Sequence, residues 1–180
     1  MKLIFVRHGQ TEYNRNKIVQ GQEVDAVLND EGIRQVEAVR ELLPSDIDFI
    51  ISSPLKRAAQ TAEILNRSLQ KEVIYNRDVM ELRYGELAGK GWPEIVEIMG
   101  DPDAHQKDKD VTFDYSPHNG DSADDLKRRV AKFVEDMKRE YPDKTILVTT
   151  HGGVIDSMHI LFPQKEKPDS GNATVHEFEF

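Results

Sequence analysis

The stretch Lys2-Leu3-Ile4-Phe5-Val6-Arg7-His8-Gly9 carries the first clear structural signal in the chain. The apolar residues 3–6 are typical of a short strand that is buried on both faces of a parallel sheet. Arg7 and His8 follow at the end of that strand, and Gly9 permits a tight turn. Ligands bind at the carboxyl ends of the strands in open α/β sheets, so the stretch predicts a buried strand that ends in a polar site. Taken alone, the tripeptide is equally compatible with a polar turn.

Strand-like and helix-like segments alternate along the rest of the chain, which is typical of an α/β domain. Short apolar runs predict strands at residues 46–52, 73–75 and 144–150. Apolar residues at helical spacing predict helices at residues 31–43, 54–69, 123–139 and 153–161. Alternation of His176 and Phe178 with Glu177 and Glu179 predicts an edge strand with one wetter face at residues 174–180. We therefore expect a three-layer α/β/α sandwich with a mostly parallel central sheet.

Polar residues and a proline predict where three of the helices begin. Asn29 or Asp30 is suited to cap the helix at residues 31–43. Ser122 with Asp125 resembles a capping box, with Asp in place of Glu. Ser53 is a suitable N-cap for the helix at residues 54–69, with Pro54 at its first position.

Length and composition indicate one folded domain over residues 1–180. The hydrophobic share of 38% and the charged share of 32% suit a globular protein with a well-charged surface. Residues 100–120 differ from the rest, because they are polar, contain Pro102 and Pro117 and show no clear period. We expect them to form a long loop that serves as a lid or specificity element over one end of the domain.

Charge and composition exclude several classes of function. The formal net charge of −9 argues against a broad nucleic-acid-binding surface. No segment is apolar enough to span a membrane, and the run at residues 3–6 is too short for the core of a signal peptide, so we expect a cytoplasmic protein. The chain has no cysteine, which excludes disulfides and thiolate chemistry. Its histidines are scattered without paired metal-ligand spacing, so we expect no metal.

Two further segments repeat the order of a strand followed by polar residues. Arg57 lies in the first turn of the helix that follows the strand at 46–52, where a helix N-terminus and a guanidinium together suit an anion. His151 and a glycine follow the strand at 144–150. Each residue has an ordinary alternative: Arg57 as a surface arginine, His151 as a structural histidine, and Glu81 as a surface carboxylate. Two strand ends that each carry His and Gly nevertheless favour a shared site.

Together these motifs resemble the histidine phosphatase superfamily, also called phosphoglycerate mutase-like. The resemblance covers nearly the whole chain. It rests, in chain order, on Arg7-His8-Gly9-Gln10-Thr11-Glu12 with Asn14, Gly21 with Asp25, Leu28 and Gly32, Ser52-Ser53-Pro54 through Arg57 and Thr61, Glu81 with Tyr84-Gly85 and Gly89, Gly120-Asp121-Ser122, Thr150-His151-Gly152-Gly153 and Asn172-Ala173-Thr174. Asp121 stands where the family has Glu.

The resemblance implies a role for each matching residue. His8 would be the nucleophile that becomes phosphohistidine, with its other ring nitrogen tied to an acceptor. Three residues would hold the phosphoryl oxygens, namely Arg7, Arg57 and His151. Glu81 would protonate the leaving oxygen, which requires a raised pKa. Further substrate contacts are expected from Asn14, Gln20, Gly21, Arg83 and Gly152. Phosphoryl transfer needs mainly positioning and positive charge, so we expect no cofactor.

We expect the chain to hydrolyse a small phosphomonoester. The alternative is a phosphoglycerate mutase-type phosphotransferase, because Arg83 belongs to a mutase-like motif and could contact a substrate carboxylate. The short, acidic segment 100–120 favours a phosphatase, since it suits a pocket open to water. A catalytically inactive module that binds phosphorylated ligands would lack His8, an arginine or His151, and none is missing.

The sequence leaves the substrate and the oligomeric state open. Residues 20–27 and 100–120 are expected to set specificity, and both a monomer and a homodimer are compatible with the sequence. His105 and His118 are expected to be solvated loop histidines, and Trp92 to pack against the core.

Overall fold

A mixed sheet forms the centre of the computed structural model, which describes residues 1–164 and 169–180. Its five strands are β1 (Lys2–Arg7), β2 (Phe49–Ser52), β3 (Val73–Tyr75), β4 (Thr145–Thr150) and β5 (Val175–Glu179). They lie in the order β3-β2-β4-β1-β5, and all neighbours are parallel except β5, which is antiparallel to β1. The predicted, mostly parallel sheet is confirmed.

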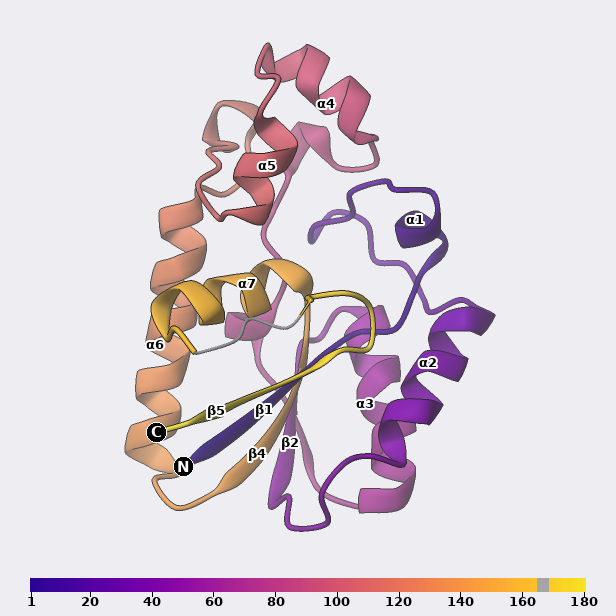
Figure 1. The fold of residues 1–180 in the computed structure, drawn as a ribbon, viewed down its shortest axis with the longest axis vertical. Helices are drawn as coiled ribbons and strands as arrows, with labels where there is room; N and C mark the ends of the chain where they lie inside the picture. Colours follow the sequence, from indigo (N-terminus) through magenta and orange to yellow (C-terminus); the bar gives the residue numbers. More distant parts are fainter. Residues whose placement is uncertain (165–168) are drawn as a thin grey trace.

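Helices cover both faces of this sheet (Figure 1). The helices α2 (Asp30–Arg40) and α3 (Lys56–Leu69) lie on one face, and α6 (Ala123–Glu140) and α7 (Gly152–Leu161) on the other. Alternate residues of β1 supply the two cores: Leu3 and Phe5 pack with α6 and α7, whereas Ile4 and Val6 pack with α2 and α3. This burial on both faces explains the continuous apolar run and confirms the three-layer sandwich.

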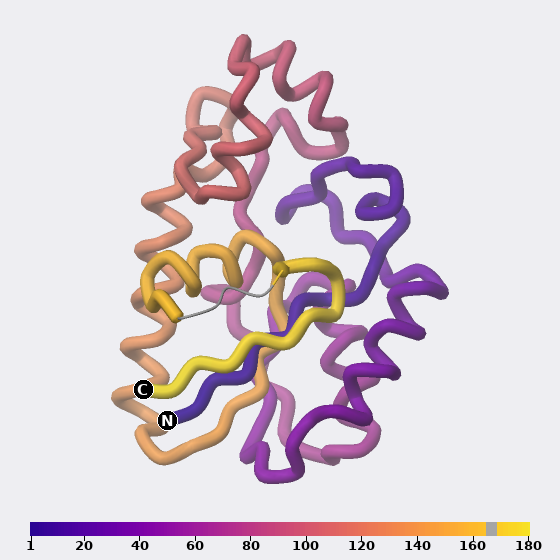
Figure 2. The backbone as a smooth tube through the Cα atoms, viewed as in Figure 1, coloured from indigo at the N-terminus to yellow at the C-terminus, as the bar shows by residue number. Residues whose placement is uncertain are grey.

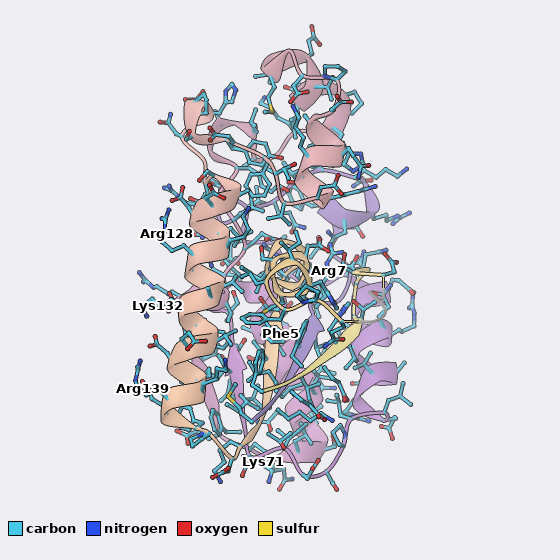
Figure 3. All side chains as sticks on the ribbon, turned by 60° about the vertical axis from the view of Figure 1, so that its left-hand side comes forward. Phe5, Arg7, Lys71, Arg128, Lys132 and Arg139 are labelled. Carbon is cyan, nitrogen blue, oxygen red and sulfur yellow. The ribbon has the colours of Figure 1, made fainter. Side chains whose placement is uncertain are left out.

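The outer side of α6 is charged. Figure 3 shows Arg128, Lys132 and Arg139 projecting away from the sheet, while Phe5 lies between the sheet and the helix. Phe5 makes an edge contact with Phe133 at 6.4 Å between ring centroids. An apolar stripe that faces the sheet and a charged outer face together make this helix amphipathic.

The C-terminal strand β5 closes one edge of the sheet. His176 and Phe178 are buried while Glu177 and Glu179 are exposed, so the predicted edge strand with one wetter face is confirmed. The backbone N–H of Phe180 donates to the carbonyl oxygen of Met1 at 2.9 Å. The two termini therefore lie side by side, as Figure 2 shows.

The segment 100–120 is more regular than expected. It contains the helix α5 (Ala104–Lys109) and a 3-10 turn, η3 (Ser116–His118), and it follows the unpredicted helix α4 (Trp92–Met99). These helices are too short to show a helical period in sequence. Three side chains fix the segment to the core, those of Val111, Phe113 and Tyr115. We call residues 92–120 the lid, which lies beyond the sheet at the top of Figure 1.

Two of the three predicted helix starts are confirmed. Asn29 caps α2 by accepting a hydrogen bond from the N–H of Gly32 at 2.8 Å, and Ser122 with Asp125 forms the capping box of α6. The predicted start of α3 at Pro54 is wrong. That helix begins at Lys56 without a side-chain cap, because the backbone of Leu55 is extended (φ −66°, ψ 134°); the Ser53 hydroxyl accepts from the N–H of Leu55 and contacts His151.

Three short elements escaped prediction, namely α1 (Glu12–Arg15), η1 (Arg77–Val79) and η2 (Gly85–Leu87). Each covers fewer residues than the apolar pattern of a helix needs to repeat. No helix within the described residues combines the length and apolar character required to cross a membrane.

Candidate active site

A cavity of about 400 Å³ opens between the carboxyl end of the sheet and the lid. It is lined by Arg7, His8, Asn14, Lys17, Ile18, Val19, Gln20, Gly21, Arg57, Glu81, Tyr84, Trp92, His105 and Asp108. Strand register explains the convergence, since Arg7 pairs with Thr150 and Ser52 pairs with Thr149 at the same end of the sheet. The residues that directly follow these strands must therefore meet at one edge.

His8 is a buried, neutral imidazole with one ring nitrogen available to react. Its Nδ1 lies 2.7 Å from the carbonyl oxygen of Gly9, which accepts a hydrogen bond and so fixes the proton on Nδ1. Burial, followed by the charges of Arg57 and Arg7, holds the pKa of His8 well below its usual value. The Nε2 lone pair is thus available near pH 7 as a nucleophile.

The loop that carries His8 is fixed from both sides. The N–H of Gly9 donates to the Thr61 hydroxyl at 3.2 Å, and the Asn172 amide donates to the His8 carbonyl oxygen at 3.1 Å. A Cβ at position 9 would lie 2.4 Å from the carbonyl oxygen of Gly32. Gly9 is therefore required by the close approach of this loop to the start of α2.

Arg7 and Arg57 place two cationic side chains at the cavity. Arg57 donates to the carbonyl oxygens of Gly21 at 2.7 Å and Val24 at 3.0 Å, and Arg7 donates to the carbonyl oxygen of Ser170. The Nε of each arginine is buried without a hydrogen-bond partner. Burial lowers the pKa of Arg57 to about 10, so it remains a cation near neutral pH. Buried donors without partners indicate an anionic ligand.

His151 presents an unpartnered ring nitrogen beside His8. The two rings lie 5.2 Å apart between centroids. The Ser53 hydroxyl lies 2.8 Å from Nε2 of His151 and also accepts a hydrogen bond from the N–H of Leu55. Nδ1 of His151 is buried without a hydrogen-bond partner. Burial, followed by the charge of Arg57, keeps the pKa of His151 well below its usual value.

Glu81 supplies a half-buried carboxyl group at the same cavity. Its oxygens accept hydrogen bonds from the N–H of Leu82 at 3.1 Å and of Gly153 at 3.4 Å. Burial raises the pKa of Glu81, although the charges of Arg57 and Arg7 oppose the shift. A carboxyl group in such surroundings retains its proton more readily than a solvated one, which is the condition for a general acid.

Four of the five predicted substrate contacts lie where a ligand can reach them. Asn14, Gln20 and Gly21 line the cavity, and Gly152 lines an adjoining cavity of about 300 Å³. Arg83 lines neither one, because its exposed guanidinium is paired with Asp121 at 2.8 Å. The structure therefore does not bring Arg83 to the site.

The lid contributes residues that sequence reasoning missed. Trp92 and His105 line the cavity and stack on each other at 4.5 Å between ring centroids. Trp92 also packs against the core and His105 is exposed, as expected from the sequence. Asp108 and Tyr84 also line it. Tyr84 belongs to the motif around Glu81, which could have flagged it, whereas nothing in the sequence distinguishes Asp108 from the other acidic residues nearby.

A metal centre finds no support in the arrangement of ligands. Within the described residues, no group of three or more His, Cys, Asp or Glu side chains could hold a metal ion. The buried histidines His159 and His176 contact each other at 2.9 Å, but neither lines the cavity. The chemistry available at the cavity is that of an uncharged imidazole, two guanidinium groups and a carboxyl group.

Comparison with known proteins follows the same motifs. The model of the histidine phosphatase superfamily (branch 1) matches residues 3–179. In Arabidopsis thaliana, phosphoglycerate mutase-like protein 4 is 34% identical over 88% of this chain and 69% of its own length. A metal-independent phosphoserine phosphatase of the same plant is 31% identical over 91% of this chain and 69% of its own length. A mycobacterial glucosyl-3-phosphoglycerate phosphatase, solved with VO3, has a TM-score of 0.81 and 27% identity, with 98% and 91% of the chains covered.

Proposed function

The chain belongs to the histidine phosphatase superfamily, and we propose that it hydrolyses a small phosphomonoester through a phosphohistidine on His8 without a metal. The observation that carries the proposal is the state of the His8 ring. Nδ1 of His8 donates a hydrogen bond to the carbonyl oxygen of Gly9, and the pKa of the ring is lowered. Nε2 therefore keeps a lone pair that can attack phosphorus. Relatives named as phosphatases support hydrolysis.

In the first step, Nε2 of His8 attacks phosphorus in line with the leaving oxygen. The bond from phosphorus to that oxygen breaks, and Glu81 donates the proton that the leaving alkoxide needs. Arg7, Arg57 and the Nδ1–H of His151 face the phosphoryl oxygens, where charge builds in the transition state. Their unpartnered, buried donors support this assignment.

In the second step, a water molecule attacks the phosphohistidine. Glu81 now carries the negative charge and accepts a proton from that water, so the carboxyl group returns to its starting state. The bond from phosphorus to Nε2 breaks, and inorganic phosphate leaves. The phosphorylated ring of His8 is positively charged because Nδ1 keeps its proton. The carbonyl oxygen of Gly9 stabilises this charge by accepting the hydrogen bond from Nδ1–H.

Phosphotransfer between phosphoglycerates is less well supported. That alternative depended on Arg83 as a contact for a substrate carboxylate, and Arg83 is paired with Asp121 outside both cavities. The inactive binding module is also disfavoured, because His8, Arg7, Arg57 and Glu81 line one cavity and His151 lies beside His8.

The test is turnover of p-nitrophenyl phosphate in EDTA, combined with a rapid quench that traps acid-labile phosphoprotein. We expect the wild type to turn over and to trap phosphate, and His8→Ala to do neither. His118→Ala is the matched control, since this histidine lies in the lid but lines neither described cavity. Turnover by His8→Ala, or full loss of wild-type activity in EDTA, would refute the mechanism. Interconversion of phosphoglycerates that depends on a bisphosphate primer would favour the phosphotransferase.

A further inference from the structure

A lid carboxyl group, Asp108, lies at the cavity without a role in the mechanism above. It belongs to α5 and lines both the catalytic cavity and the adjoining cavity of about 300 Å³. Both cavities also share Arg7, Glu81, Tyr84 and His105. Asp108 is therefore located where a group attached to the reacting phosphate can reach it.

Two tyrosines hold this carboxyl group in place through a single oxygen. The hydroxyl groups of Tyr84 and Tyr115 both donate to Oδ1 of Asp108, at 2.8 and 2.9 Å. The tyrosine rings pack on each other at 5.1 Å between centroids, so the clamp is rigid. No hydrogen bond joins Oδ2 to a side chain or backbone group of the described residues, which leaves this oxygen as a fixed acceptor.

The charge around Asp108 determines what this acceptor can bind. Four carboxyl groups line the adjoining cavity, against the cations Arg7 and Lys109 and the imidazole of His105: those of Glu81, Asp108, Asp156 and Asp169. Burial is the main cause that raises the pKa of Asp108 to about 7, and the charges of Glu81 and Asp156 add to it. An anionic group in this cavity would be repelled by the carboxylates, whereas a cationic or hydroxyl donor would form a hydrogen bond with one of them.

The mechanism defines which part of the substrate reaches Asp108. His8 attacks phosphorus from one side, and Glu81 protonates the leaving oxygen. The leaving group thus extends from Glu81, which lines both cavities together with Asp108. The stacked rings of Trp92 and His105 also line the catalytic cavity and limit the size of that group.

We propose that Asp108 determines specificity by accepting a hydrogen bond from the leaving group, foremost from an ammonium and secondly from a hydroxyl group. The preferred substrates are then phosphomonoesters of small amino alcohols or polyols, and esters of hydroxy acids that lack an amine are disfavoured. This inference rests on the proposed phosphatase activity.

The first test compares four small substrates with the wild-type protein at about pH 8, above the pKa of Asp108. O-phosphoethanolamine carries an ammonium, glycerol 1-phosphate carries hydroxyl groups, ethyl phosphate carries no donor, and phosphoglycolate carries a carboxylate. We expect kcat/KM for O-phosphoethanolamine to exceed that for ethyl phosphate by about 10- to 100-fold, with glycerol 1-phosphate between them and phosphoglycolate slowest. Equal kcat/KM values for O-phosphoethanolamine and ethyl phosphate would overturn the proposal. This comparison requires only the wild-type protein.

The second test uses Asp108→Asn, which keeps an oxygen for the tyrosine hydroxyls but removes the charge. We expect the preference for O-phosphoethanolamine over ethyl phosphate to fall to about threefold or less, while the ratio between p-nitrophenyl phosphate and ethyl phosphate, neither of which carries a donor for Asp108, stays the same. Asp110→Asn is the matched control, because Asp110 is exposed and its side chain accepts hydrogen bonds from the Gln106 amide on the outside of α5. An unchanged preference in Asp108→Asn, or an equal loss on all substrates, would overturn the assignment. If the wild type hydrolyses none of the four substrates and not p-nitrophenyl phosphate either, the result would instead refute the proposed phosphatase activity.

Discussion

Replacement of Gly153 by alanine tests the role of Glu81 without altering its carboxyl group. A Cβ at position 153 would lie 2.5 Å from Oε1 of Glu81 and 2.8 Å from Cδ2 of Leu82. Ordinary contact begins at 3.4 Å, so the carboxyl group must move by about 0.9 Å. A displacement of about 1 Å at a reacting group can lower the rate by about 100-fold.

The loss should depend on the leaving group. An alkyl phosphate needs a proton on its leaving oxygen, whereas p-nitrophenolate leaves readily without one. We expect Gly153→Ala to lower kcat by about 100-fold on ethyl phosphate and by less than about threefold on p-nitrophenyl phosphate. Alanine favours a helix over glycine by about 0.5–1 kcal/mol, and this gain opposes the crowding of the new Cβ against the buried Leu82 side chain.

The assay is steady-state hydrolysis of both substrates, with thermal melting as a check on folding. Glu81→Gln, alone and combined with Gly153→Ala, shows whether Gly153→Ala lowers the rate through Glu81. If Gly153→Ala acts through Glu81, adding it to Glu81→Gln should cost little more. Equal losses on both substrates, or losses that add in the double variant, would refute the reasoning.

Three further predictions follow from hydrogen bonding and titration at the site. Ser53→Ala removes the hydroxyl that bonds to Nε2 of His151 and accepts from the N–H of Leu55, so we expect kcat/KM for p-nitrophenyl phosphate to fall about tenfold, with a lower melting temperature because a buried donor loses its partner; full activity would contradict this. The lowered pKa of His8 should place the acid limb of kcat/KM below pH 6.5, and the raised pKa of Glu81 should give ethyl phosphate an alkaline limb that p-nitrophenyl phosphate lacks; identical pH profiles would disprove it. The folded protein binds the Asp108 proton more tightly than the unfolded chain, with a pKa of about 7 against 3.8, so this group stabilises the fold fully below about pH 4 and the contribution is lost as the pH rises through about 7. The variant Asp108→Asn carries no titratable group there, although it faces the same charges of Glu81 and Asp156. Its melting temperature should therefore exceed that of the wild type by more at about pH 8 than at about pH 5. An equal difference at both pH values would count against this prediction.

The sequence by itself determined the sheet, its flanking helices and the convergence of its strand-end motifs. The continuous apolar runs of β1 and β4 indicated burial on both faces, and so helices on each side of the sheet. Because parallel strands end at one edge, His8, Arg57 and His151 were expected to meet there. These predictions needed only local patterns and the geometry of a parallel sheet.

Helix starts and short elements were less well determined. Ser53 has the chemistry of an N-cap, yet its hydroxyl bonds to His151, a residue distant in the chain. The helices of the lid are stabilised by buried side chains such as Phe113 and Tyr115, and not by a helical period of their own. Local propensity cannot anticipate contacts of this kind, since tertiary packing overrides it.

Only the tertiary structure decided which residues outside the motifs line the cavity. Arg83 lies two residues from Glu81 in sequence, but its pairing with Asp121 turns it away from the cavity. Asp108 lies far from Glu81 in the chain, but the tyrosine clamp brings it to the same cavity. The pKa shifts of His8, Glu81 and Asp108 likewise arise mainly from burial, which is a property of the folded chain. Strand ends bring the motif residues His8, Arg57 and His151 to one edge of the sheet, whereas long-range packing of the lid determines which other side chains line the cavity.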